Sequence, residues 1–135
     1  MRTIPDSNVV LDVLGRGTTW RNWSSHQMKH CEGSLVINQI VYAEIASELD
    51  NQTALNEVLI LLGIELEHVP FEACFDAGHA HRAYRKRGGR RERVLRDFLI
   101  GAHAATKRYR ILTRDAARYR TYFSNVEIIA PDTHP

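Results

Sequence analysis

The alternation of short apolar segments with helical segments most constrains how this chain can fold. The apolar segments are rich in β-branched residues, and each is followed by residues whose apolar positions recur at helical spacing. Strands separated by helices predict parallel pairing, with helices covering both faces of the sheet. We therefore predict a three-layer α/β/α domain with a central parallel sheet of four or five strands. The expected strands are Thr3–Pro5, Leu35–Ile37, Glu65–Val69, Arg110–Thr113 and Val126–Ala130.

The length of 135 residues and a hydrophobic content of 44% are enough for one domain, which we assign to residues 1–135. No apolar run approaches the roughly 20 residues that span a bilayer, so we expect no membrane association. The first residues lack the pattern of a signal peptide. Cys31 and Cys74 are isolated in the sequence, which is typical of a reducing compartment. We expect a cytoplasmic protein.

Four acidic residues lie where strands end or where the following helices begin. Asp6 and Asp115 follow expected strands, and Glu44 and Asp97 lie in early helical turns. These positions converge at the carboxyl edge of a doubly wound sheet. Taken singly, Asp6 could simply cap a helix and Glu44 could be a solvated side chain. Together, hard oxygen ligands without His or Cys predict a Mg²⁺ or Mn²⁺ site that activates water for attack on phosphorus.

Asn8 follows Asp6 closely, and we expect its side chain to orient the Asp6 carboxylate or a water beside it. His26 and His30 have a spacing that can bind a metal, but no third ligand lies nearby, so we interpret them as an exposed pair.

Basic residues are concentrated in one part of the chain. Residues 1–81 have a net charge of −7, residues 82–120 of +11, and residues 121–135 of −2. Eight of the basic residues lie between Arg82 and Arg96. Such clustering favours a polyanionic partner, most often nucleic acid, over a small phosphate. We predict that Arg90, Arg91, Arg93 and Arg96 bind the phosphate backbone of a nucleic acid; alternatively, these arginines are solvated or face acidic groups of a protein partner.

Other chemistries lack their motifs. The sequence has no Gly-rich phosphate loop, no GxSxG elbow and no Cys/His zinc array. A receiver domain would have adjacent acids after its first strand and a lysine after its last strand, and neither is found.

Four segments that contain these acids, in the right order over nearly the whole chain, resemble PIN-domain ribonucleases, and within them the VapC-like toxins of bacterial toxin–antitoxin modules. The matching segments are Asp6–Leu14 (DSNVVLDVL), Asn38–Glu44 (NQIVYAE), Asp97–Ala104 (DFLIGAHA) and Leu112–Asp115 (LTRD), the last followed by Arg118–Phe123 (RYRTYF).

The resemblance implies a metal-dependent endoribonuclease in which Asp6, Glu44, Asp97 and Asp115 hold Mg²⁺ or Mn²⁺. It also implies supporting roles for Asn8 and Thr113, a homodimer, and an antitoxin that blocks the site. The alternatives are a weak or inactive PIN module that binds nucleic acid, and a Mg²⁺-dependent phosphohydrolase.

The sequence departs from the family pattern at a few positions. Pro5 replaces an apolar strand residue, and proline is unusual in a central strand because it donates no ladder hydrogen bond. Gln39, Arg96 and Ala116 lie where this branch often has proline, which predicts looser turns. The four acids are intact, so we expect activity to be retained.

Overall fold

The computed structural model describes residues 1–15, 19–89 and 95–135. Its strands are β1 (Thr3–Pro5), β2 (Val36–Ile37), β3 (Glu65–Leu66), β4 (Arg110–Leu112) and β5 (Ile128–Ile129). Its helices are α1 (Ser7–Val13), α2 (Arg21–His30), α3 (Gln39–Ala46), α4 (Gln52–Leu62), α5 (Phe71–Lys86), α6 (Leu95–Lys107) and α7 (Ala117–Tyr122). All strand pairing among these residues is parallel, as predicted.

The strands form a three-stranded sheet in the order β1-β4-β5 and a two-stranded sheet, β2-β3. The two sheets meet at a single parallel bridge between Thr3 and Leu35. The fold class is as predicted, although the central sheet has three strands rather than four or five.

Pro5 explains why the two sheets are not continuous. Thr3 N–H donates to Ser34 O at 2.9 Å on the β2 side of β1, whereas Asp6 N–H donates to Leu112 O at 2.8 Å on the β4 side. Because donor direction alternates along a strand, the nitrogen of Pro5 faces β2, where it has no hydrogen to donate. Pro5 nevertheless stays in register with Leu112, so pairing with β4 continues to the end of β1.

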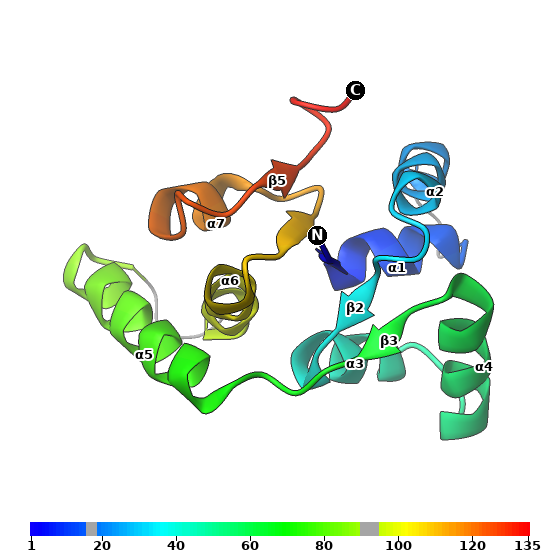
Figure 1. Cartoon of the computed structure of the whole chain (residues 1–135), viewed down its shortest axis with the longest axis horizontal. Coiled ribbons are helices and arrows are strands. Elements are labelled where there is room, and N and C mark those ends of the chain that lie inside the picture. The colour runs from blue at the N-terminus through cyan, green and yellow to red at the C-terminus, as the bar shows by residue number, and fades with distance from the viewer. Residues whose placement is uncertain (16–18, 90–94) are drawn as a thin grey trace.

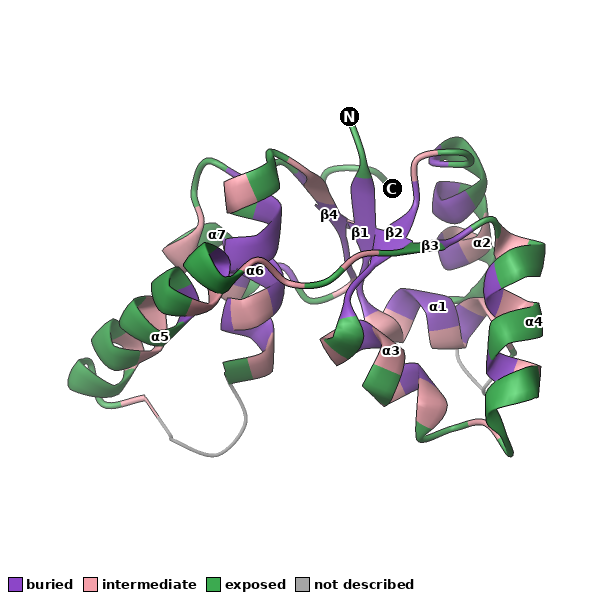
Figure 2. Ribbon diagram, turned by 60° about the horizontal axis from the view of Figure 1, so that its bottom comes forward, coloured by how far each residue is buried: buried purple, intermediate pink, exposed green. Residues whose placement is uncertain are grey.

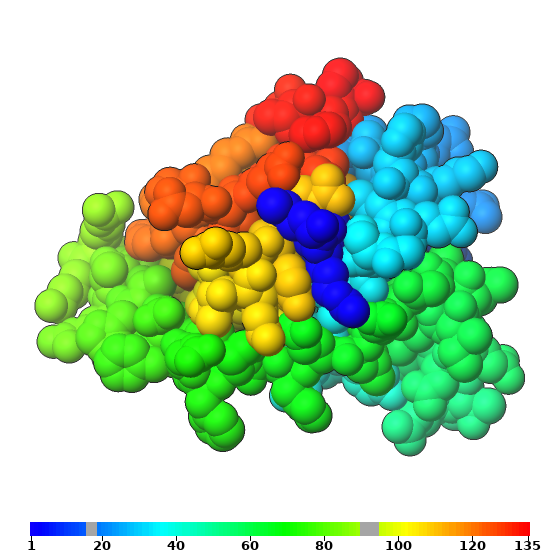
Figure 3. Space-filling model, in the orientation of Figure 1, coloured from blue at the N-terminus to red at the C-terminus, as the bar shows by residue number. Residues whose placement is uncertain are grey.

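Helices cover the strands on both sides. Helix α6 lies on one side, with α5 and α7 beside it, and α1 and α2 lie on the other (Figures 1 and 2). The strand residues are buried except for the half-buried Arg110 of β4 and both residues of β3, which are exposed (Figure 2). In the space-filling view, α5 and α4 lie at opposite ends of the molecule (Figure 3).

A second, smaller core joins α5 to α6. Ala73 and Ala77 of α5 pack with Phe98 and Ala102 of α6. Gly101 allows this region to close, because a Cβ at that position would lie 2.3 Å from the ring of Phe123. No helix within the described ranges is long and apolar enough to cross a membrane.

Candidate active site

Asp6 lies at the carboxyl end of β1, where the chain turns into α1. Its carboxylate accepts a 2.8 Å hydrogen bond from Ser7 N–H and is 2% exposed. Thr113 Oγ1 and Tyr119 OH donate to its Oδ2 at 3.0 and 3.1 Å. Asp6 therefore caps α1 and also forms the buried base of a polar cluster, so the capping and site interpretations are both compatible with its position.

Glu44 and Asp97 converge on the same cluster through the guanidinium group of Arg96. Arg96 Nη2 donates to Asp6 Oδ1 at 2.7 Å and to Glu44 Oε1 at 2.6 Å. Arg96 Nη1 pairs with Asp97 Oδ1. Asp97 Oδ2 accepts a 2.6 Å hydrogen bond from Arg118 Nη1. Three carboxylates from β1, α3 and α6 thus surround one cationic group.

The electrostatics of the cluster reflect burial and close charges. Burial lowers the pKa of Arg96, but the hydrogen bond to Glu44 and the charge of Asp6 outweigh it, so the pKa is raised overall. Burial raises the pKa of Asp97, and the charge of Arg96 opposes this shift without cancelling it. Burial, followed by the charge of Asp6, raises the pKa of Tyr119. Arg96 therefore stays charged, and Tyr119 stays a neutral hydrogen-bond donor to Asp6.

Asp115 is connected to the cluster differently from these three carboxylates. Its side chain is exposed beside a hollow of about 270 Å³ that Tyr84, Arg118 and Tyr122 also line. Its connection to the cluster is through the backbone, because Asp115 N–H donates to Thr113 Oγ1 at 3.0 Å and the same hydroxyl donates to Asp6.

Asn8 is placed differently from the expectation. Its Oδ1 accepts a 3.4 Å hydrogen bond from Arg114 N–H, so Asn8 is linked to the turn after β4, and among the described residues no hydrogen bond joins it to the Asp6 carboxylate. Thr113 Oγ1 donates directly to Asp6 Oδ2, and its supporting role stays a prediction.

Arg96 also differs from the expectation that it faces RNA, because its side chain is ion-paired with three acids of its own chain. The other predicted RNA-binding residues, Arg90, Arg91 and Arg93, lie outside the described residues.

Two residues of the cluster escaped the sequence interpretation. Arg118 and Tyr119 lie on α7, within the segment Arg118–Phe123 that matched the family pattern, but neither was assigned a role in the site. The buried Tyr119 carries a polar group at its tip, which normally has a hydrogen-bond partner, and this is the signal that could have identified it.

A separate buried ion pair lies on the other side of the turn after β4. Asp12 is 1% exposed and accepts hydrogen bonds from Ser24 Oγ at 2.6 Å and from Arg114 Nε and Nη2 at 2.7 and 3.1 Å. Its oxygens are therefore occupied, and we interpret it as a link between α1, α2 and this turn.

Another polar network lies two turns along α6 from the acids. The fully buried His103 pairs through Nδ1 with Asn38 Nδ2 at 3.1 Å and through Nε2 with Glu67 Oε2 at 2.6 Å. Tyr109 OH donates to Glu67 Oε1 at 2.8 Å.

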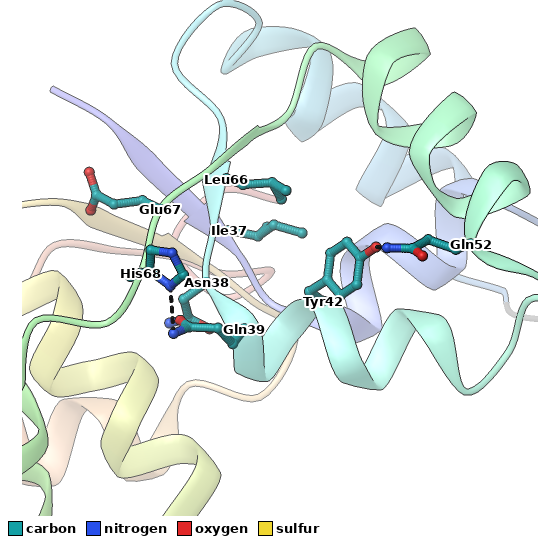
Figure 4. Close-up of a pocket in the computed structure, with 8 residues that line it drawn as sticks. All are labelled: Ile37, Asn38, Gln39, Tyr42, Gln52, Leu66, Glu67 and His68. Carbon is teal, nitrogen blue, oxygen red and sulfur yellow. Dashed lines mark hydrogen bonds between the residues drawn. The ribbon is translucent and has the colours of Figure 1, made fainter.

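A hollow of about 310 Å³ borders this network (Figure 4). Its lining contains none of the four predicted acids. The lining residues are Ile37, Asn38, Gln39, Tyr42, Gln52, Leu66, Glu67 and His68.

The acidic cluster has the type of donor atom that a divalent cation prefers. Its oxygens belong to carboxylates, which suit Mg²⁺ and Mn²⁺, and the guanidinium group of Arg96 stands where these oxygens converge. With Arg96 in this position, no three His, Cys, Asp or Glu side chains of the described residues are grouped closely enough to hold an ion.

The fold, with acids at the ends of parallel strands, matches a known family. The family model described as "PIN domain" matches residues 3–124. The chain belongs to the PIN domain family. Comparison with curated protein sequences gives no match to this PIN domain.

Solved structures share the fold of this PIN domain at low sequence identity. VapBC-1 from nontypeable Haemophilus influenzae is 16% identical with a TM-score of 0.70, and the match covers 96% of this chain and 98% of that one. FitAcB from Neisseria gonorrhoeae is 19% identical with a TM-score of 0.68, covering 98% and 99%. VapBC2 from Rickettsia felis, bound to a promoter DNA fragment, is 18% identical with a TM-score of 0.67, covering 96% and 98%.

Proposed function

We propose that this PIN domain is a metal-dependent endoribonuclease that acts as a toxin and is neutralised by an antitoxin. PIN domains are generally nucleases. The observation that carries the proposal is the convergence of Asp6, Glu44 and Asp97 on a single cationic position at the carboxyl edge of the sheet. Asp115 follows the neighbouring strand and completes the proposed set.

Each side chain has a definable role. Oδ2 of Asp97 is held by Arg118, and its Oδ1 is directed at Arg96. Oδ2 of Asp6 is held by Thr113 and Tyr119, and its Oδ1 accepts from both Ser7 N–H and Arg96. Oδ1 of each aspartate is the proposed ligand. Glu44 adds a third carboxylate from α3. A divalent ion bound there would neutralise the carboxylates and activate water for attack on the scissile phosphate. Thr113 and Tyr119 orient Asp6 by donating to its other oxygen.

Charge supports a polynucleotide substrate over a small phosphate. Arg82, Arg85, Lys86 and Arg87 are exposed at the end of α5. Together with Arg90, Arg91 and Arg93, they make the segment before Asp97 strongly basic. Such a segment can bind phosphates along a single strand, and we propose that it holds the RNA on either side of the cleaved bond.

Exposed apolar side chains support a protein partner. Phe71 and Phe75 on α5 are 94% and 66% exposed, and Ile60 and Leu61 on α4 are 81% and 84% exposed. Apolar surface of this kind marks interaction sites. The structural neighbours include complexes named VapBC and a toxin-antitoxin complex from Klebsiella pneumoniae. We propose a VapB-like antitoxin and a homodimer of this chain, both in the cytoplasm.

The test is cleavage of total RNA by the purified protein with Mg²⁺ or Mn²⁺, with a chelator, and by an Asp6→Asn variant, followed by mapping of the cut ends. We expect cleavage with the metal only, and none by the variant. Metal-independent binding of RNA without cleavage would favour the inactive nucleic-acid-binding module. Hydrolysis of small phosphate esters without RNA cleavage would favour the phosphohydrolase.

A further inference from the structure

Arg96 occupies an electrostatically unusual position. It lies in the first turn of α6, where the helix dipole disfavours a positive charge. The side chain is nevertheless directed inward to Asp6, Glu44 and Asp97, and remains 30% exposed. Its position therefore depends on these three ion pairs, which outweigh the dipole.

The guanidinium group is not fully satisfied by its partners. Nη2 serves both Asp6 and Glu44, and Nη1 pairs with Asp97. Nε lies within ion-pair distance of Glu44 but, although buried, makes no hydrogen bond of good geometry. A buried donor without a directed partner weakens the arrangement.

The oxygens that do not face Arg96 are held independently. Asp6 Oδ2 accepts from Thr113 and Tyr119, and Asp97 Oδ2 accepts from Arg118. If Arg96 turned out to solvent, these contacts would keep Oδ1 of both aspartates directed at the vacated position. The two aspartates would thus keep one oxygen each directed at the place that Arg96 occupies, and the positive charge there belongs to a partly exposed side chain next to Asp97 in the sequence.

We propose that Arg96 is a built-in counter-cation that competes with the divalent ion for the acidic cluster and leaves it when the ion binds. The inference rests on the proposed function, because it concerns the same acids. Without an ion, Arg96 offsets the repulsion among three carboxylates and stabilises the fold. With an ion, the released guanidinium adds a positive charge at the mouth of the site, beside the proposed path of the RNA.

The test is direct measurement of Mn²⁺ binding, by the electron paramagnetic resonance signal of free Mn²⁺, for the wild type and Arg96→Gln. Coupling of this kind typically changes affinity 5- to 150-fold, so we expect Arg96→Gln to bind Mn²⁺ at least about 5-fold more tightly. Its Tm should be lower than that of the wild type without metal and should rise more on adding Mn²⁺. Arg96→Lys, which keeps the charge but loses the paired donors, should be intermediate and serves if Arg96→Gln does not fold.

Arg120→Gln is the matched control, because Arg120 forms a similar paired contact with the exposed Asp132, at 2.6 and 2.8 Å. It should bind Mn²⁺ like the wild type. Equal affinity of the Arg96 variants and the wild type would overturn the role of Arg96 and leave the proposed metal site intact. Failure of both wild type and variants to bind Mn²⁺ would overturn the metal site itself, and this inference with it.

Discussion

Helix α6 contributes to two buried polar clusters that differ in how completely their members are paired. At its first turn, Asp97 joins a cluster of carboxylates held by arginines that reach the surface. Two turns later, His103 joins Asn38, Glu67 and Tyr109 in a chain of hydrogen bonds in which each side chain has a fixed partner. The first cluster has carboxylate oxygens directed at the guanidinium group of Arg96, whereas the second has both ring nitrogens of its histidine occupied.

The difference separates a proposed site from a structural element. A fully paired buried network stabilises and specifies the packing around it, but has no group left for a ligand. Converging carboxylates repel one another, so they raise the energy of the fold unless a cation is present. Changes at Asp97 should therefore affect activity more than stability, and changes at His103 should do the reverse.

The largest effect is expected from Asp97→Asn. Loss of one charged oxygen ligand should lower kcat for RNA cleavage by at least about 10²–10³-fold, as measured in a single-turnover assay. The Tm should change little, because the loss of two arginine contacts is offset by removal of a buried charge. Asp132→Asn, at an exposed acid, is the control and should cleave normally. Undiminished cleavage by Asp97→Asn would remove that residue from the site.

An intermediate effect is expected from His103→Ala. The change leaves a cavity and removes the partners of buried Asn38 and of Glu67, so the free energy of unfolding should fall by about 2–4 kcal/mol in urea titrations. Mn²⁺ affinity should stay at the wild-type value. His79→Ala, on the exposed surface of α5, is the control. A stable variant that no longer bound Mn²⁺ would show that the two clusters are not separable.

The smallest effect concerns pH. Burial lowers the pKa of His103, and the facing Glu67 opposes this only in part, while Lys107 adds to it. The unfolded chain therefore takes up a proton at this residue more readily than the folded protein. The contribution of the neutral His103 imidazole to the free energy of unfolding is complete above about pH 6.5, the ordinary pKa of histidine. This contribution is lost as the pH falls toward the lowered pKa of His103 in the folded protein.

Urea titrations between pH 5 and pH 8 should show this loss in the wild type and not in His103→Gln. The difference between the two proteins isolates His103 from the other six histidines. Parallel pH curves would mean that His103 does not titrate differently in the folded state.

Local patterns in the sequence predicted the elements well where neighbouring residues determine the outcome. Asn38 is a residue type that favours helix N-termini, and its side chain caps α3 at the N–H groups of Ile40 and Val41. Gly63 is a residue type that favours helix C-termini, and it ends α4 in the left-handed conformation, with φ of 66°.

The lengths of two strands were predicted wrongly. The strand expected over Val126–Ala130 comprises only Ile128 and Ile129. The strand expected over Glu65–Val69 is paired only at Glu65 and Leu66, because β2 offers a partner of two residues. Alternating apolar residues indicate a preference for extended backbone. They do not indicate how long the neighbouring strand is, and that length limits how many residues can pair.

The sequence by itself determined the α/β class and the positions of the strands along the chain. It also determined where acidic residues follow these strands, because all three features depend on local periodicity and on residue type. Only the tertiary structure decided which side chains meet. Arg96 lies 90 residues from Asp6 and 52 from Glu44, and His103 lies 36 residues from Glu67. Contacts over such separations leave no local pattern, so a basic residue in a basic segment was indistinguishable from an RNA ligand until the packing of α6 directed it at the acids. The same holds for Pro5, whose missing donor matters only because β2 lies on that side of β1.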